Sequence, residues 1–132
     1  MSFLGGDIKE LKVEHPTLGS FIFEAKANED TESNKGGIRV NDDDNGITAA
    51  GTIILTGSYT RPYIQVTLAM NNETEKFITD WAESLKLATI TYTMITGDVF
   101  RGSAIPVGDL KPSSLNATMQ VKLAGGGKFQ KI

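Results

Sequence analysis

Residues 63–70 read Tyr-Ile-Gln-Val-Thr-Leu-Ala-Met, with an apolar side chain at every second position from Ile64 to Met70. Successive side chains of an extended chain point to opposite faces, so these apolar residues share one face. An α-helix, with its period of about 3.6 residues, would spread the same residues around its circumference. The stretch therefore predicts a β-strand with one buried face and one polar but uncharged face.

The same two-residue period recurs along most of the chain. Residues 87–96 alternate apolar side chains with threonines, and residues 115–124 alternate Leu, Ala, Met, Val and Leu with Asn, Thr, Gln and Lys. Threonine-rich faces agree with the preference of β-branched residues for sheets. The other segments that we expect to be extended are residues 9–13, 19–25, 38–40, 47–59 and 99–105. The first two predict a hairpin through residues 15–19, and the last pairs with residues 87–96 through a turn at 96–98.

One segment has a helical period instead. Asn72, as an N-cap with Glu75 three residues on, resembles a capping box, and Lys86 suits the last turn of a helix. The apolar residues at helical spacing are Phe77, Ile78, Trp81, Ala82 and Leu85. These residues predict one helix of about 14 residues with its apolar stripe in the core. The expected fold is mainly β, a small β-barrel or sandwich of antiparallel strands with one α-helix packed against it.

Composition limits the available chemistry. The chain has 132 residues, no cysteine and a single histidine, His15. Disulfides, thiolate metal sites and cysteine nucleophiles are therefore excluded, and Ser–His catalysis would depend on one ring that no nucleophile-elbow pattern accompanies. A net charge of −3 argues against a surface that grips nucleic acid, and we find no apolar run of membrane-spanning length and no signal peptide. We expect a soluble single-domain protein, made in the cytoplasm, that is not an enzyme.

The charge is unevenly distributed. Residues 1–44 hold ten acids and five bases, and residues 45–132 hold six acids and eight bases. Either the two halves interleave in the fold and the field averages out, or the protein has an acidic and a basic side suited to stacking on copies of itself.

Two motifs resemble ligand sites. Residues 41–46 (Asn-Asp-Asp-Asp-Asn-Gly) look like the start of a calcium loop, but Thr52 stands where the bidentate Glu belongs, which favours a solvated turn. Residues 125–128 (Gly-Gly-Gly-Lys) are followed by Phe129 rather than by Ser or Thr and a helix, which favours a flexible or tightly bent tail over a phosphate loop. We therefore predict no metal and no cofactor.

Four stretches together resemble the tail tube proteins of contractile bacteriophage tails. Residues 23–30 and 36–43 carry the first part of the resemblance, and residues 102–110 and 117–128 match that family's closing segment. The chain departs from the family pattern at residues 103–104, where a second glycine is common.

The resemblance implies a virion structural protein that self-assembles into hexameric rings, which stack into the inner tail tube through which DNA is ejected without specific binding. It is similar in plan to type VI secretion and tailocin tubes. The implied location is the virion tail, after assembly in the host cytoplasm. The implied partners are further copies of the chain, then sheath, baseplate hub, tape-measure and tail terminator proteins, with no membrane.

By analogy with the family, three segments of the single domain (residues 1–132) are expected at subunit contacts: the N-terminal arm (1–7), a polar loop or hairpin extension (26–51) and the Gly-rich tail (125–132). The residues expected at contacts between subunits or rings are Phe3, Leu4, Asp42, Asp43, Asp44, Lys122, Lys128 and Phe129. Two alternatives stay open, namely a tube-initiating or tube-capping ring component and a monomeric β-sandwich that binds a ligand on a threonine-rich face.

Overall fold

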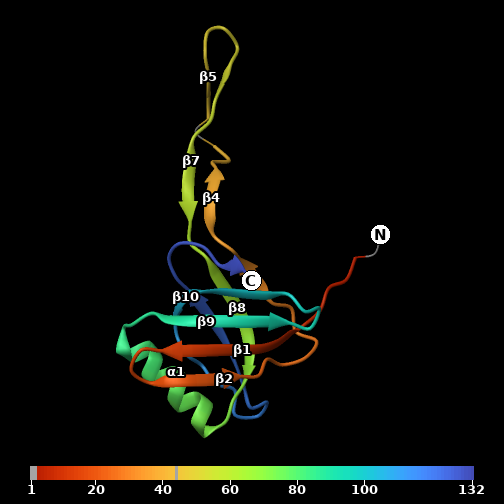
Figure 1. Cartoon of the computed structure of the whole chain (residues 1–132), viewed down its shortest axis with the longest axis vertical. Helices are drawn as coiled ribbons and strands as arrows, with labels where there is room; N and C mark the ends of the chain where they lie inside the picture. Colours follow the sequence, from red (N-terminus) through yellow and green to blue (C-terminus); the bar gives the residue numbers. More distant parts are fainter. Residues whose placement is uncertain (1–2, 44) are drawn as a thin grey trace.

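The computed structural model describes residues 3–43 and 45–132. Within them the chain is mainly β, with one helix (Figure 1). The elements are β1 (Ile8–His15), β2 (Gly19–Phe23), β3 (Glu32–Asn34), β4 (Gly37–Val40), β5 (Gly46–Ile47), β6 (Ile53–Ile54), β7 (Gly57–Thr60), β8 (Tyr63–Ala69), α1 (Asn72–Ser84), β9 (Ala88–Met94), β10 (Val99–Val107), β11 (Thr118–Ala124) and β12 (Gln130–Lys131). No helix among these residues is long and apolar enough to cross a membrane.

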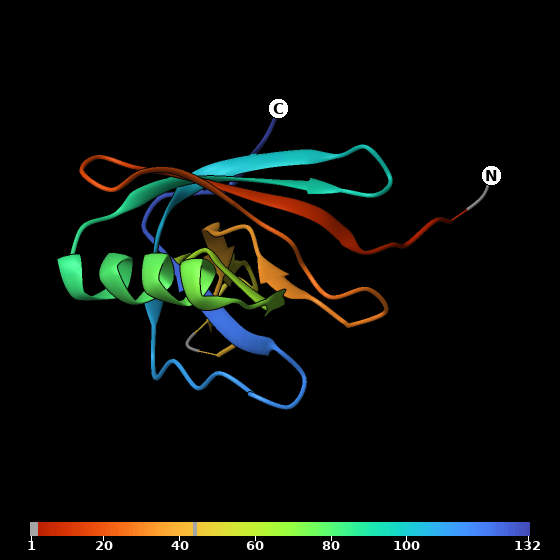
Figure 2. The same ribbon diagram turned by 90° about the horizontal axis from the view of Figure 1, so that it is seen from below.

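A large antiparallel sheet forms the body, with strands in the order β2-β1-β9-β10-β11-β8-β3 and β12 paired to β10. Figure 2 shows two halves of this sheet facing each other, with β1 and β9 in one layer and β8 and β11 in the other. A single bridge joins Ala25, just beyond β2, to Leu68 of β8. Because β2 and β3 otherwise remain at the edges, the described strands do not form a closed barrel. The prediction of a mainly antiparallel β-fold with one helix packed against it is confirmed, and the sheet is open and not a closed barrel.

The core lies between the two layers and under α1. The alternation of the sequence determines which side chains enter it, because one face of each strand points inward. The apolar faces predicted for the segments of β8, β9 and β11 point into the core within those strands, and one face of β1 is buried as well. Their buried members are Leu11, Val13, Ile64, Val66, Leu68, Ile90, Tyr92, Met119, Val121 and Leu123.

The N-cap of the helix lies one residue earlier than predicted, and the helix itself begins at Asn72. Asn71, not Asn72, is the N-cap, and its side chain accepts a hydrogen bond from Thr74 N at 3.0 Å while Thr74 Oγ1 accepts from Asn71 N. Thr74 thus takes the place we assigned to Glu75. Ile78 and Trp81 are fully buried, as the stripe predicts. Leu85 is exposed, because it ends the helix in the left-handed conformation (φ 58°) instead of continuing it.

Two expected strands are shorter in the structure. Residues 115–117 form a turn, with Leu115 93% exposed and Ala117 at φ 52°, so β11 starts only at Thr118. The expected strand over residues 47–59 is interrupted and reverses direction, giving β5 on one side of a turn and β6 and β7 on the other. The first part of the stretch expected to be a polar loop or hairpin extension (26–51) contains the short strand β3.

Candidate functional site

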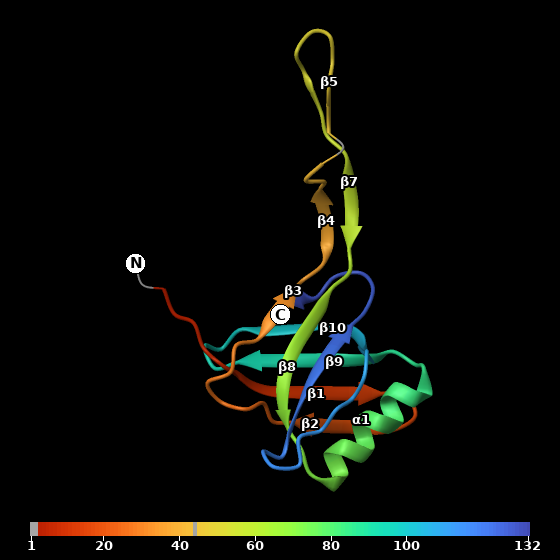
Figure 3. The same cartoon turned by 180° about the vertical axis from the view of Figure 1, so that it is seen from behind.

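A two-stranded arm stands away from the body (Figure 1). It runs from Gly37 to Thr60, with β4 paired to β7 near the body and β5 paired to β6 further out. Figure 3 shows the same projection from behind, with β8 continuing from β7 into the sheet. The hairpin extension predicted at residues 26–51 therefore begins and ends about ten residues later in the chain, because the polar residues 32–34 pair with β8 of the body.

The arm holds its shape through asparagine side chains at its midpoint. Asn41 Nδ2 donates to Thr56 Oγ1 at 3.1 Å, and Ser58 Oγ donates to Asn41 Oδ1 at 2.8 Å. Asn45 bridges in the same way, since its Nδ2 donates to Asn41 O at 2.7 Å and its Oδ1 accepts from Thr56 N at 3.0 Å. These bonds replace ladder bonds where the strand pairing is broken between β4 and β5.

The turn predicted at residues 41–46 is a bend partway along the arm, not its tip. The chain reverses further out, where Thr48 N donates to Thr52 O at 2.8 Å and Gly51 takes φ +89°. Asp42 and Asp43 lie exposed at the bend, and Asp44 lies outside the described residues. Among the described residues, no group of three or more His, Cys, Asp or Glu side chains is placed to hold a metal ion.

Large apolar side chains are exposed along the whole arm. Tyr59 is 83% exposed and Ile47 is 71% exposed, and none of the set is covered by the body. The full set is Ile38, Val40, Ile47, Ile53, Ile54, Leu55 and Tyr59. A two-stranded hairpin is marginally stable at best in water, and large exposed apolar side chains gathered on one projecting element indicate an interaction site. We call this surface the arm surface.

The C-terminal tail fixes the base of the arm. Gly36 forms a bridge with Lys128, and Phe129 N donates to Lys35 O at 2.7 Å. Gly36 takes φ +78° and packs so closely that a Cβ there would lie 2.8 Å from Gly127 O. The Gly-rich tail is therefore tightly bent, the second of the two forms that we predicted, and it supports the arm directly.

The other predicted contact residues lie in three different places. Phe3 and Leu4 are exposed in the N-terminal arm, whose first two residues lie outside the described ranges. Lys122 Nζ lies 4.4 Å from the centre of the Tyr63 ring, and Lys128 lies beside Gly37, so both border the base of the arm. Phe129 is only 1% exposed and belongs to the core of its own chain.

His15 lies beside a serine, but the hydrogen bond between them runs in the wrong direction for catalysis. Its Nδ1 accepts from the backbone N–H groups of Thr17 and Leu18, both at 3.1 Å, so the ring proton lies on Nε2. Nε2 lies 3.0 Å from Ser84 Oγ, which itself donates to Trp81 O at 2.6 Å. A general base needs a free nitrogen lone pair facing the hydroxyl, whereas here the hydroxyl accepts from the ring.

The His15 contact joins the first hairpin to the end of α1. Burial and, secondly, the positive charge of Lys86 lower the pKa of His15 below its ordinary value. Both effects favour the neutral ring that the hydrogen bonds require. The His15–Ser84 pair is therefore a structural link between β1 and the helix.

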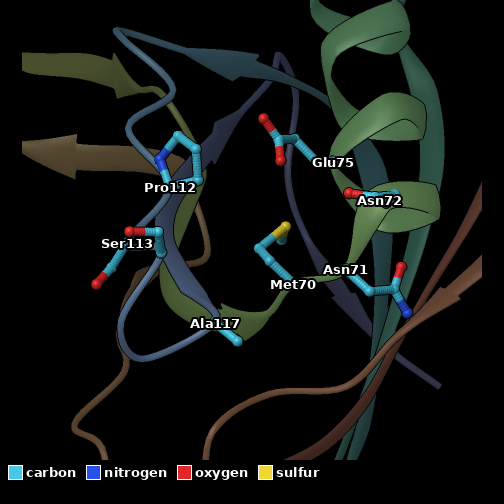
Figure 4. A pocket seen from close by; sticks show the side chains of 8 residues that line it. Met70, Asn71, Asn72, Glu75, Pro112, Ser113 and Ala117 are labelled. Atoms are coloured by element: carbon cyan, nitrogen blue, oxygen red, sulfur yellow. The ribbon is translucent and has the colours of Figure 1, made fainter.

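Several pockets elsewhere on the described part of the chain are open to solvent, and one of them adjoins the helix cap. Figure 4 shows the one at the N-terminus of α1, about 400 Å³ in volume, lined by Met70, Asn71, Asn72, Glu75, Pro112, Ser113, Ser114 and Ala117. The Asn71 side chain is already used as the helix cap, and Glu75 is the single charged residue of the lining. The arm surface is thus the most distinctive candidate site on the described part of the chain.

No model of a known protein family matches this sequence, and no curated protein matches it either.

Proposed function

We propose that the protein is a structural subunit that assembles with copies of itself into stacked hexameric rings, forming a tail tube through which DNA passes. The arm surface is the observation that carries this proposal. Seven large apolar side chains stay in water on a monomer, and burial against another chain removes that cost, at roughly 25 cal/mol per Å² of apolar area. An arm that projects from the body can contact a neighbouring subunit, whereas it does not enclose a small ligand.

The edges of the sheet support the same proposal. Among the described strands, β2 has no neighbour on its outer side, although Ala25 just beyond its end forms a bridge with Leu68, and β3 has none on its own outer side. Unpaired edges of this kind invite pairing with another chain, and a ring of subunits satisfies them in a closed arrangement.

Electron microscopy and sedimentation velocity of the purified protein test the proposal. We expect rings or tubes of uniform bore, with assembly that rises with concentration. The double variant Ile47→Ser/Ile53→Ser should shift assembly to at least tenfold higher concentration, because both side chains lie on the arm surface and neither packs on the body.

Leu115→Ser is the control, since Leu115 is even more exposed than Ile47 and Ile53 but lies in a turn of the body. It should leave assembly unchanged. Strict monomers at high concentration would overturn the proposal and favour the monomeric binding module. Rings that never stack would identify an initiating or capping ring component instead.

A further inference from the structure

An apolar groove lies between the first hairpin and the helix. Its floor holds Phe21 and Phe77, whose rings stack with centres 4.9 Å apart at 25°, and Leu18 borders it from the β1–β2 turn. Its volume is about 330 Å³, and its rim holds Glu73, Lys76 and Asp80. The groove therefore has an apolar floor and a charged rim, and it is open to solvent.

The groove and the arm lie at opposite ends of the molecule. In Figures 1 and 3, α1 and β2 occupy the end of the long axis away from the arm. One copy cannot place its own arm in its own groove, so an arm that fills the groove belongs to a second copy. A contact between two different surfaces is head-to-tail, and it repeats from copy to copy until a ring closes or a filament grows.

The base of the arm and the helix carry opposite charge, while Asp42 and Asp43 are exposed further out on the arm. Around the base of the arm lie Lys35, Arg39, Arg61, Lys122 and Lys128, with Glu32 as the acid among them, where it accepts from Tyr63 OH at 2.6 Å. We call these five cations the basic collar. The exposed side of α1 holds Glu73, Glu75 and Glu83 without ion-pair partners in the described part of the chain, while Lys76 pairs with Asp80 at 2.8 Å.

The charges therefore orient the same contact that the apolar surfaces favour. If the arm of one copy reaches the groove of the next, the collar at the arm's base comes to face α1. Opposite charges across an interface fix its register and exclude the reversed arrangement, in which like charges would meet.

We infer that the arm surface of one copy docks in the groove formed by Leu18, Phe21 and Phe77 of a second copy, with the basic collar facing the glutamates of α1. The inference rests on the proposed self-assembly, and it assigns the receiving surface and the direction of stacking. The occupant is a second copy of this chain.

Cysteine cross-linking tests the docking directly, because the chain has no cysteine of its own. Lys76→Cys protein is mixed with Leu55→Cys protein and, separately, with Ile53→Cys protein, and then oxidised under assembling conditions. At least one mixture should give a disulfide-linked dimer several times faster than the same arm variant mixed with Asp30→Cys, an exposed loop position away from the groove.

Charge reversal tests the orientation. Glu73→Lys/Glu75→Lys should weaken association about tenfold or more, and adding Lys128→Glu to the partner protein should restore much of it. Asp30→Lys is the matched control and should have little effect. Circular dichroism of each variant establishes that the fold is retained.

The outcomes separate the inference from the proposed function. Rings or tubes that form without cross-linking at Lys76→Cys, or that tolerate the glutamate reversal, would overturn the groove assignment while leaving self-assembly intact. Absence of any assembly in the unmodified protein would overturn both.

Discussion

Replacing Phe129 with alanine should destabilise the fold strongly, although only three residues follow it in the sequence. Its ring is 1% exposed, meets Tyr92 edge-on with centres 6.2 Å apart and covers Gly102. A Cβ on Gly102 would overlap the Phe129 ring, so the backbone of β10 and the ring are in direct contact. No side chain can move into the space from the Gly102 side.

The magnitude follows from this burial. Truncation of a buried Phe to Ala costs about 3–5 kcal/mol, and the lost edge-on contact with Tyr92 is part of that cost. We expect a loss near 3.5 kcal/mol in the free energy of unfolding and a Tm lower by roughly 10 °C. A typical domain has about 5–15 kcal/mol in total, so the variant should remain folded at low temperature.

Urea denaturation followed by tryptophan fluorescence measures the effect, because Trp81 is the only tryptophan and is fully buried. Both proteins are compared at one low concentration, so that assembly does not add to the measured stability. Ile132→Ala, in the same tail but exposed, is the control and should change stability by less than about 0.5 kcal/mol. A loss below about 1 kcal/mol for Phe129→Ala would refute the reasoning.

The result also decides how a tail truncation is interpreted. A chain ending after Ala124 lacks Phe129 and the bridge to Gly36. We expect it to assemble poorly, and loss of stability to be the first cause. Normal tubes from the truncated chain would show that the tail is dispensable.

Three further predictions concern pH, the helix cap and the arm. Folding lowers the pKa of His15, so the link from His15 to the helix stabilises the fold fully above the unfolded pKa near 6.5 and less as the pH falls below it. The urea midpoints measured at pH 7.5 and at pH 5 should therefore differ more in the natural protein than in His15→Gln. Asn71→Ala should cost about 1 kcal/mol in urea denaturation, since it removes the cap on Thr74 N, and no measurable loss would contradict that role. Asp42→Lys/Asp43→Lys tests the charge of the surface that the bend meets, by light scattering at an unchanged Tm. Docking beside the glutamates of α1 predicts assembly at least as fast as in the natural protein, whereas slower assembly would show that the bend meets a cationic surface and would contradict that docking.

The strands and the helix follow from local pattern to a large extent. Ile64, Val66 and Leu68 alternate in the sequence and are all buried, because an extended chain offers just two faces and one of them meets the core. The helix was equally clear from the spacing of Ile78 and Trp81. Its cap was displaced by one residue, since adjacent asparagines offer two equivalent candidates and the choice depends on which one turns out of the preceding strand.

The arm could not be placed from the sequence in the same way. Residues 47–59 are as apolar as a core strand, and apolar residues are usually buried, so Ile53 and Leu55 would be expected in the core. In the structure both side chains are exposed. Conversely, Phe129 follows three glycines near the end of the chain and reads as part of a tail, yet it is buried. Whether an apolar residue is buried depends on what lies across from it, and local sequence does not contain that information.

The sequence by itself determined the mainly antiparallel β-fold, the single helix and the inward face of each body strand, because these depend on periods of two and of about 3.6 residues within one segment. The tertiary structure alone decided which apolar segments stay outside and where the charges gather. The arm base, the C-terminal tail and β8 come together from positions up to about ninety residues apart, as the bridge from Gly36 to Lys128 shows. The opposition of the basic collar and the acidic helix exists only once those segments are in contact, since neighbours in space, not in sequence, set the charge of a surface.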